Sequence, residues 1–200
     1  GRIPALPDAE GRPRDLIAVY QDVTERKHAE LDLRKKAALT RLLEALATET
    51  NKAATPEDAL RACLTHIRMY GAWRIGHVVT FKPDAPTYVQ ESSLWKIEET
   101  DEERFAPFIG LSNHYDYDTA RGPLIAAMLR DQRPVWVQDM ASLPHRGRFG
   151  SLRDQGIRSA FGFPVVVEGE VLALLEFFGE GLAHLTIADR AGGSFGKYAA

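Results

Sequence analysis

The spacing of apolar and polar residues predicts two helices in the first third of the chain. From Glu25 to Thr50 there is no Gly or Pro, and the segment is rich in Ala, Leu, Glu, Lys and Arg, which favour helix. Thr24 can cap its start. A second helix is predicted from Thr55-Pro-Glu-Asp, which combines an N-cap, a first-turn Pro and two acids near the positive helix end, and Gly71 ends it.

Apolar runs bounded by turn residues predict strands in the rest of the chain. The expected strands cover residues 73–81, 88–95, 134–138, 158–167 and 171–178. Glu168-Gly-Glu170 would join the last two in a hairpin. A capping box at Thr100–Glu103 predicts one short helix, and Pro123–Arg130 predicts another. The polar stretches 112–122 and 141–150 are expected to be loops, and residues 183–200 a closing helix.

This order of elements predicts an α+β fold. We expect an antiparallel sheet with the N- and C-terminal helices on one face. Loops and short helices should cover the other face, with a pocket beneath them. A space between sheet and loops is the usual place for a small ligand, so the pattern favours a binding module.

The beginning of the chain does not fit this domain. Residues 1–15 are rich in Gly, Pro and charge and are expected to be a loop, whereas Leu16–Gln21 has strand character. One strand cannot form a domain alone, so it should complete a sheet whose other strands lie outside this sequence. The first residue is Gly1 rather than Met, and we therefore expect the sequence to be a piece of a longer protein.

The composition argues against nucleic acids and membranes as partners of this protein. The 200 residues are 44% hydrophobic and 26% charged, with a formal net charge of -3, which is ordinary for a soluble globular protein. No basic surplus indicates nucleic acid or an anionic membrane surface as a partner. No signal peptide or apolar run of about 20 residues is apparent, so no direct membrane contact is expected. The single Cys63 excludes an intramolecular disulfide and favours a cytoplasmic location.

The sequence does not predict a catalytic or metal-binding site. The six histidines lack metal-ligand spacing, so no metal site is predicted, although a haem ligand among them stays open and the cofactor is unknown. Gly192-Gly-Ser-Phe-Gly-Lys197 lacks the first Gly and the final Ser or Thr of a phosphate loop. No catalytic residue and no enzymatic activity are therefore predicted for this segment, including ATP-dependent autophosphorylation.

One acidic residue stands out. Glu176 lies within an otherwise apolar strand, where a buried carboxylate needs a partner or a raised pKa. It would form a salt bridge to Arg158 or Arg74 across the sheet, or else contribute a polar group to the ligand cavity. The alternating strand 160–167 and the neighbouring strands supply the other candidates. The predicted pocket residues are His77, Phe161, Phe163 and Glu176.

The terminal helices are candidates for dimerisation. Leu39, Leu42 and Leu46 form an apolar face on the first helix, while Gly192 and Gly196 would allow the closing helix to approach a neighbour closely. Charged residues interrupt a strict coiled-coil seam, so a solvated linker helix is the alternative. In a parallel homodimer these helices would form a four-helix bundle whose shifts could carry a signal.

Two segments resemble known families. Residues 16–30 resemble the last strand and exit of a PAS domain, in which an Asp-hydrophobic-Thr step, here Asp22-Val-Thr24, leads into a signalling helix. Residues 38–200 resemble a GAF domain. The motifs that carry this second resemblance are Gly71-Ala-Trp73, Ser93-Leu-Trp95, Arg133–Asp139, Gly156–Pro164 and Val171–Phe178.

The resemblances imply a domain order and a function. Residues 1–24 would be the end of a PAS domain, 25–37 a signalling helix and 38–200 the GAF domain. Together they imply a sensory input module of a bacterial signal-transduction protein, above all a sensor histidine kinase, that senses a small ligand and relays it through dimeric helices. The alternatives are an input module of a diguanylate cyclase or phosphodiesterase, and a ligand-free structural dimerisation module. The single cysteine argues against a GAF-fold methionine sulfoxide reductase.

Overall fold

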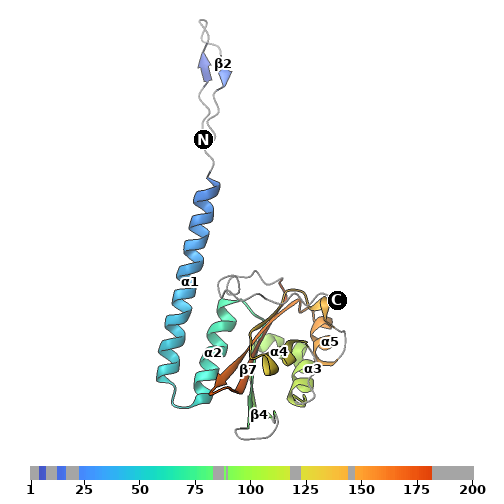
Figure 1. Cartoon of the computed structure of the whole chain (residues 1–200). Coiled ribbons are helices and arrows are strands. Elements are labelled where there is room, and N and C mark those ends of the chain that lie inside the picture. The colour runs from blue at the N-terminus through green and yellow to red at the C-terminus, as the bar shows by residue number, and fades with distance from the viewer. Residues whose placement is uncertain are drawn as a thin grey trace. The chain divides into compact units, whose positions relative to one another are not determined.

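The chain is described by a computed structural model that covers residues 5–7, 13–16, 23–82, 88, 90–117, 123–143 and 147–181 (Figure 1). It divides into two compact units, residues 1–39 and 40–200. In the first unit, β1 (Ala5–Pro7) pairs antiparallel with β2 (Pro13–Leu16). The prediction of a loop for residues 1–15 was therefore wrong at both strands, because they pair with each other locally. The predicted strand Leu16–Gln21 lies outside the described residues beyond Leu16.

The predicted first helix is confirmed as α1 (Thr24–Lys52), which begins in the first unit and ends in the second. Its first half is solvated, since Leu31 and Leu33 are exposed. Leu42 is buried, and Leu39 and Leu46 are half-buried. One residue of the predicted apolar face, Leu42, is therefore already shielded from solvent within a single chain.

The second predicted helix is confirmed as α2 (Pro56–Tyr70). The hydroxyl of Thr55 accepts a hydrogen bond from the Asp58 backbone N–H at 3.1 Å, and the Gly71 N–H donates to the Ile67 carbonyl at 3.0 Å. α2 packs against β3 (Ile75–Phe81) and β4 (Gln90–Ile97). Gly76 makes this approach possible, because a Cβ there would lie 2.9 Å from Leu64 Cδ1.

The described residues of the second unit form an antiparallel sheet of five strands in the order β4-β3-β7-β6-β5. Its other members are β5 (Val135–Val137), β6 (Ser159–Val167) and β7 (Glu170–Gly179). The predicted hairpin joins β6 to β7, and both Glu168 and Gly169 adopt positive φ at 53° and 87°. These elements confirm the predicted α+β fold, with strand ends displaced by one or two residues.

Short helices cover the face of the sheet opposite α2 (Figure 1). They are η1 (Glu99–Asp101), α3 (Glu102–Asn113), α4 (Pro123–Arg130), η2 (Met140–Ser142) and α5 (Gly147–Asp154). The opposition follows from the register: Gly76 pairs with Phe177 and faces α2, whereas Gly162 pairs with Glu176 and faces Met128 of α4. The main apolar core fills the space between the sheet and these short helices.

Three local predictions need correction or lie outside the structure. The capping box at Thr100 is not formed, because Thr100 lies inside η1 and Asp101 occupies the N-cap of α3 without a side-chain hydrogen bond. The predicted loop 141–150 contains parts of η2 and α5 instead. The predicted closing helix, with Gly192 and Gly196, lies outside the described residues.

Candidate functional site

A group of polar side chains is buried between the sheet and the short helices. Glu176 on β7 is the direct cross-strand partner of His77 on β3, and Arg148 reaches the pair from the first turn of α5. The side chains of all three are fully buried. Ser93 on β4 and Ser112 on α3 complete the group, which we call the buried polar cluster: His77, Ser93, Ser112, Arg148 and Glu176.

Glu176 is the centre of the cluster. Its Oε1 accepts a hydrogen bond from Arg148 Nη2, and its Oε2 lies 2.9 Å from His77 Nδ1. Arg148 Nη1 donates to the hydroxyl of Ser112 at 3.3 Å. The carboxylate thus holds together two strands and one helix that are distant in the sequence.

Aromatic rings surround the charged groups. The imidazole of His77 stacks on Trp95 with ring centroids 3.8 Å apart and an interplanar angle of 14°. The guanidinium of Arg148 lies over Phe149 and Tyr115, 4.7 and 4.8 Å from the two ring centroids. Such cation–π contacts stabilise a buried cation when water is excluded. Trp95 and Tyr115 are only half-buried, so the cluster approaches solvent on that side.

The protonation states follow from the partners. Burial acts to raise the pKa of Glu176, but the charge of Arg148 and the contacts with His77 outweigh it and lower that pKa to about 2. Burial acts to lower the pKa of Arg148, yet the neighbouring carboxylate holds it above its ordinary value. Burial lowers the pKa of His77, and its hydrogen bond to Glu176 offsets this only in part. At neutral pH the cluster therefore contains one anion, one cation and a neutral imidazole.

The tautomer of His77 is fixed by the same contacts. An ionised carboxylate can only accept hydrogen bonds, so the ring proton must lie on Nδ1 and point toward Glu176. Nε2 is then an acceptor, and it receives the hydroxyl proton of Ser93 across 2.8 Å. Both ring nitrogens are thereby satisfied within the described residues.

Two buried polar atoms beside the cluster lack hydrogen-bond partners among the residues that the structure describes. They are Nε of Arg148 and the hydroxyl of Tyr117. Tyr117 is 2% exposed, and burial raises its pKa far above the ordinary value for tyrosine. The charges of Arg148 and Glu176 both act on this hydroxyl, and the Tyr117 ring packs edge-on against Tyr115 at 5.1 Å.

The sequence identified part of this arrangement. It named His77 and Glu176, and the structure brings them together. It proposed Arg158 or Arg74 as the partner of Glu176, and this was wrong: Arg158 is exposed, and Arg74 pairs with Asp101. The actual partner, Arg148, was missed because it lies in a stretch expected to be a loop, where Gly residues hide the helical periodicity.

The predicted grouping of Phe161 and Phe163 with His77 and Glu176 is also wrong. Phe161 pairs with Phe177, and Phe163 pairs with Leu175, so both side chains project from the face that α2 covers. There they join a second aromatic cluster, in which Phe161 lies 4.9 Å from Trp136 and 6.5 Å from Trp73. Alternation within one strand separates its two faces, but it does not show which face matches that of a neighbouring strand.

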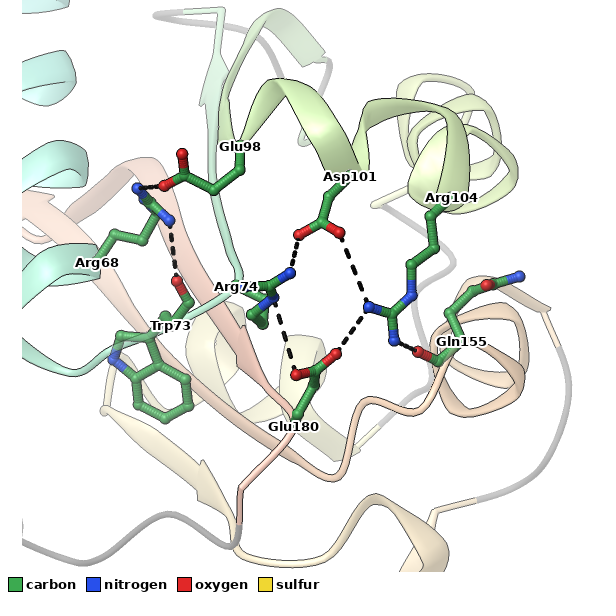
Figure 2. Close-up of polar contacts among 8 residues, drawn as sticks. All are labelled: Arg68, Trp73, Arg74, Glu98, Asp101, Arg104, Gln155 and Glu180. Carbon is green, nitrogen blue, oxygen red and sulfur yellow. Dashed lines mark hydrogen bonds and ion pairs between the residues drawn. The ribbon is translucent and has the colours of Figure 1, made fainter.

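A second polar network connects the elements around the cluster (Figure 2). Arg104 on α3 donates to Glu180 at 2.7 Å and to the carbonyl of Gln155. Arg74 binds Asp101, and Arg68 binds Glu98 and the carbonyl of Trp73. We call this the ion-pair network. It connects the residue after β7 with the end of α5, whose first turn carries Arg148.

Metal binding and membrane spanning were the two other properties to consider for the part of the chain that the structure describes. No group of three or more His, Cys, Asp or Glu side chains there could hold a metal ion. None of the described helices combines the length and apolar character that crossing a membrane requires.

Comparison with known proteins identifies the family. The family model for the GAF domain matches residues 53–192, and the chain therefore belongs to the GAF domain family, a family of signalling and sensory modules. No curated protein matches the sequence. The family match begins within the second unit, and nothing in these comparisons addresses the predicted PAS segment.

Solved structures agree on the fold. The GAF domain of A. aeolicus nlh2 in an inactive state matches with a TM-score of 0.51 and 15% identity, covering 73% of this chain and 82% of that one. The N-acylhomoserine lactone dependent transcription factor CepR2 from Burkholderia cenocepacia gives 0.51 and 16%, covering 76% and 85%. The GAF domain of an Acinetobacter phosphoenolpyruvate-protein phosphotransferase gives 0.50 and 12%, covering 76% and 84%.

Proposed function

We propose that this chain is the sensory input part of a bacterial signal-transduction protein, with the buried polar cluster as its ligand site. The observation that carries the proposal is the burial of Glu176 and Arg148 beneath the short helices of a GAF domain. A buried ion pair generally stabilises a fold no better than apolar residues of similar volume, so its presence calls for another role. CepR2, which depends on N-acylhomoserine lactone, has the same fold, and this supports a small molecule as the signal.

The output is proposed by family analogy alone, from the resemblance of residues 16–30 to a PAS exit and of residues 38–200 to a GAF domain. We propose a sensor histidine kinase as the whole protein, with a diguanylate cyclase or phosphodiesterase as the second candidate. In this proposal the segment itself is not an enzyme, and it acts in the cytoplasm. Neither output activity can be inferred from the buried polar cluster, because one fold serves many functions.

The ion-pair network suggests how the site would communicate. α5 carries Arg148 at its start, and the carbonyl of Gln155 follows its end. Arg104 binds that carbonyl together with Glu180, the residue after β7. We propose that a ligand that binds Arg148 shifts α5, and that Arg104 transmits this movement to the chain leaving β7.

The ligand site is tested by a thermal-shift screen of small metabolites against the wild-type protein. A compound at about 100 times its dissociation constant stabilises the fold by about 2.7 kcal/mol. For a domain of this size that corresponds to a rise in Tm of about 5–10 °C. The matched control is the double variant Arg148→Met/Glu176→Leu, which replaces the ion pair with apolar side chains. Hits should be lost in it, and a screen without wild-type hits would favour a ligand-free structural module.

Dimerisation through α1 is a separate part of the proposal. Leu39→Glu is expected to convert a dimer into a monomer, because each buried Leu contributes about 1.5–3 kcal/mol to an apolar seam. Leu33→Glu is the matched control, since Leu33 is exposed and lies off the predicted face. Light scattering at high micromolar concentration measures the mass. A wild-type monomer, or a Leu39→Glu dimer, would contradict the predicted seam. Leu42 is less suitable because it is already buried in one chain.

A further inference from the structure

The unpaired atoms beside the buried polar cluster have a defined chemistry. Nε of Arg148 can only donate a hydrogen bond, and the hydroxyl of Tyr117 can donate as well as accept. A buried donor without a partner is unfavourable, and the charge of Arg148 acts on the Tyr117 hydroxyl, so a molecule that satisfies both groups is favoured. That molecule must offer an acceptor, since Arg148 cannot accept.

The charge of the cluster limits which acceptor fits. Arg148 and Glu176 carry opposite charges, and the neutral His77 adds none, so the formal charges sum to zero. A carboxylate or phosphate ligand would add a buried negative charge that no other buried cation among the described residues balances. Burying an unbalanced ion is strongly unfavourable. An uncharged acceptor satisfies the same donors without this penalty.

The walls of the site favour an aromatic or apolar body on that acceptor. The rings of Tyr115, Phe149 and Phe108 lie around the guanidinium of Arg148, with centroids 4.7 to 5.7 Å from its Cζ. Tyr115 is half-buried, and we expect a molecule to reach the cluster from its side. Ligand sites of this kind combine apolar walls with a few polar groups that fix orientation.

We propose that the ligand sensed by this domain is an uncharged, mainly apolar molecule whose carbonyl-type oxygen accepts hydrogen bonds from Arg148 Nε and the Tyr117 hydroxyl. This inference rests on the proposed ligand-sensing function and narrows it to one chemical class. It excludes organic anions at this site.

Matched probes of nearly equal size test the class. Acetophenone and benzamide are neutral acceptors, whereas benzoate is an anion of the same shape at pH 7.5. Ligand-observed NMR with the wild-type chain is expected to show binding of a neutral probe at least tenfold tighter than benzoate. Tyr117→Phe should weaken the neutral probe about three- to tenfold, the value of one hydrogen bond. Tyr115→Phe is the control and should change affinity less than twofold, because it keeps the ring that packs on Arg148.

A folding defect would be recognised in the same experiment. Tyr117→Phe removes an unpaired buried hydroxyl, so its Tm should equal or exceed that of the wild type. Benzoate binding as tightly as the neutral probes, or a neutral probe unaffected by Tyr117→Phe, would overturn the inference and leave ligand sensing standing. If none of the probes binds but the metabolite screen gives a hit, the inference is overturned when that hit is charged or when Tyr117→Phe leaves its affinity unchanged. Failure of both probes and screen would remove the proposed ligand site itself.

Discussion

Glu176→Gln is expected to lower the free energy of unfolding by about 3–5 kcal/mol, the cost of removing one partner from a buried ion pair. Gln keeps the size of the side chain and can still accept a hydrogen bond, but it leaves the charge of Arg148 without a counter-ion. Arg148 cannot relieve this by losing its proton, because the pKa of a guanidinium is too high. Urea denaturation followed by circular dichroism measures the change.

Two controls separate the ion pair from a general sensitivity to mutation. Glu180→Gln removes a carboxylate that also binds an arginine, but this pair is partly exposed, and the expected loss is below about 1 kcal/mol. The double variant Arg148→Met/Glu176→Leu removes both charges and should recover most of the stability lost in Glu176→Gln. If Glu176→Gln cost no more than Glu180→Gln, the charges would not be as strongly coupled as their geometry implies.

The fold could be predicted from the sequence because its signals are local. Thr55 and Pro56 define the start of α2, and the strands of the last hairpin are continuous apolar runs joined at Glu168-Gly169. Each of these patterns depends on residues within one element and its turn. The pairing of residues 5–7 with residues 13–16 was missed because short strands that pair with each other have no long apolar run to reveal them.

The site was predictable only in part because it depends on contacts between distant elements. Glu176 stood out as a charge in an apolar strand, and His77 lay on a strand expected nearby. Arg148 gave no such signal: it follows Gly147 in a polar stretch, and only the packing of α5 on the sheet brings it to the carboxylate. The error over Phe161 and Phe163 has the same origin, since a one-residue difference in register moves a side chain to the other face.

Acid is expected to destabilise the domain in two stages, through His77 and then Glu176. The pKa of His77 is below its ordinary 6.5 in the folded protein, so below pH 6.5 the unfolded chain binds a proton that the folded chain does not. Stability is therefore full above pH 6.5 and falls as the pH decreases. Glu176 acts in the same direction between pH 4.5 and about 2. At about 1.4 kcal/mol per pKa unit, its complete protonation would remove roughly 3 kcal/mol.

Urea denaturation at a series of pH values from 8 to 2 measures both stages. His77→Gln keeps an N–H that can donate to Glu176 but cannot titrate, so its stability should change less between pH 7 and 5 than that of the wild type. Arg148→Met/Glu176→Leu should flatten the lower stage in the same way. The sign of the first stage is decisive. If His77 were instead a cation paired with Glu176, folding would raise its pKa, and the wild type would gain stability as the pH falls from that raised pKa to 6.5 and lose none of it below 6.5.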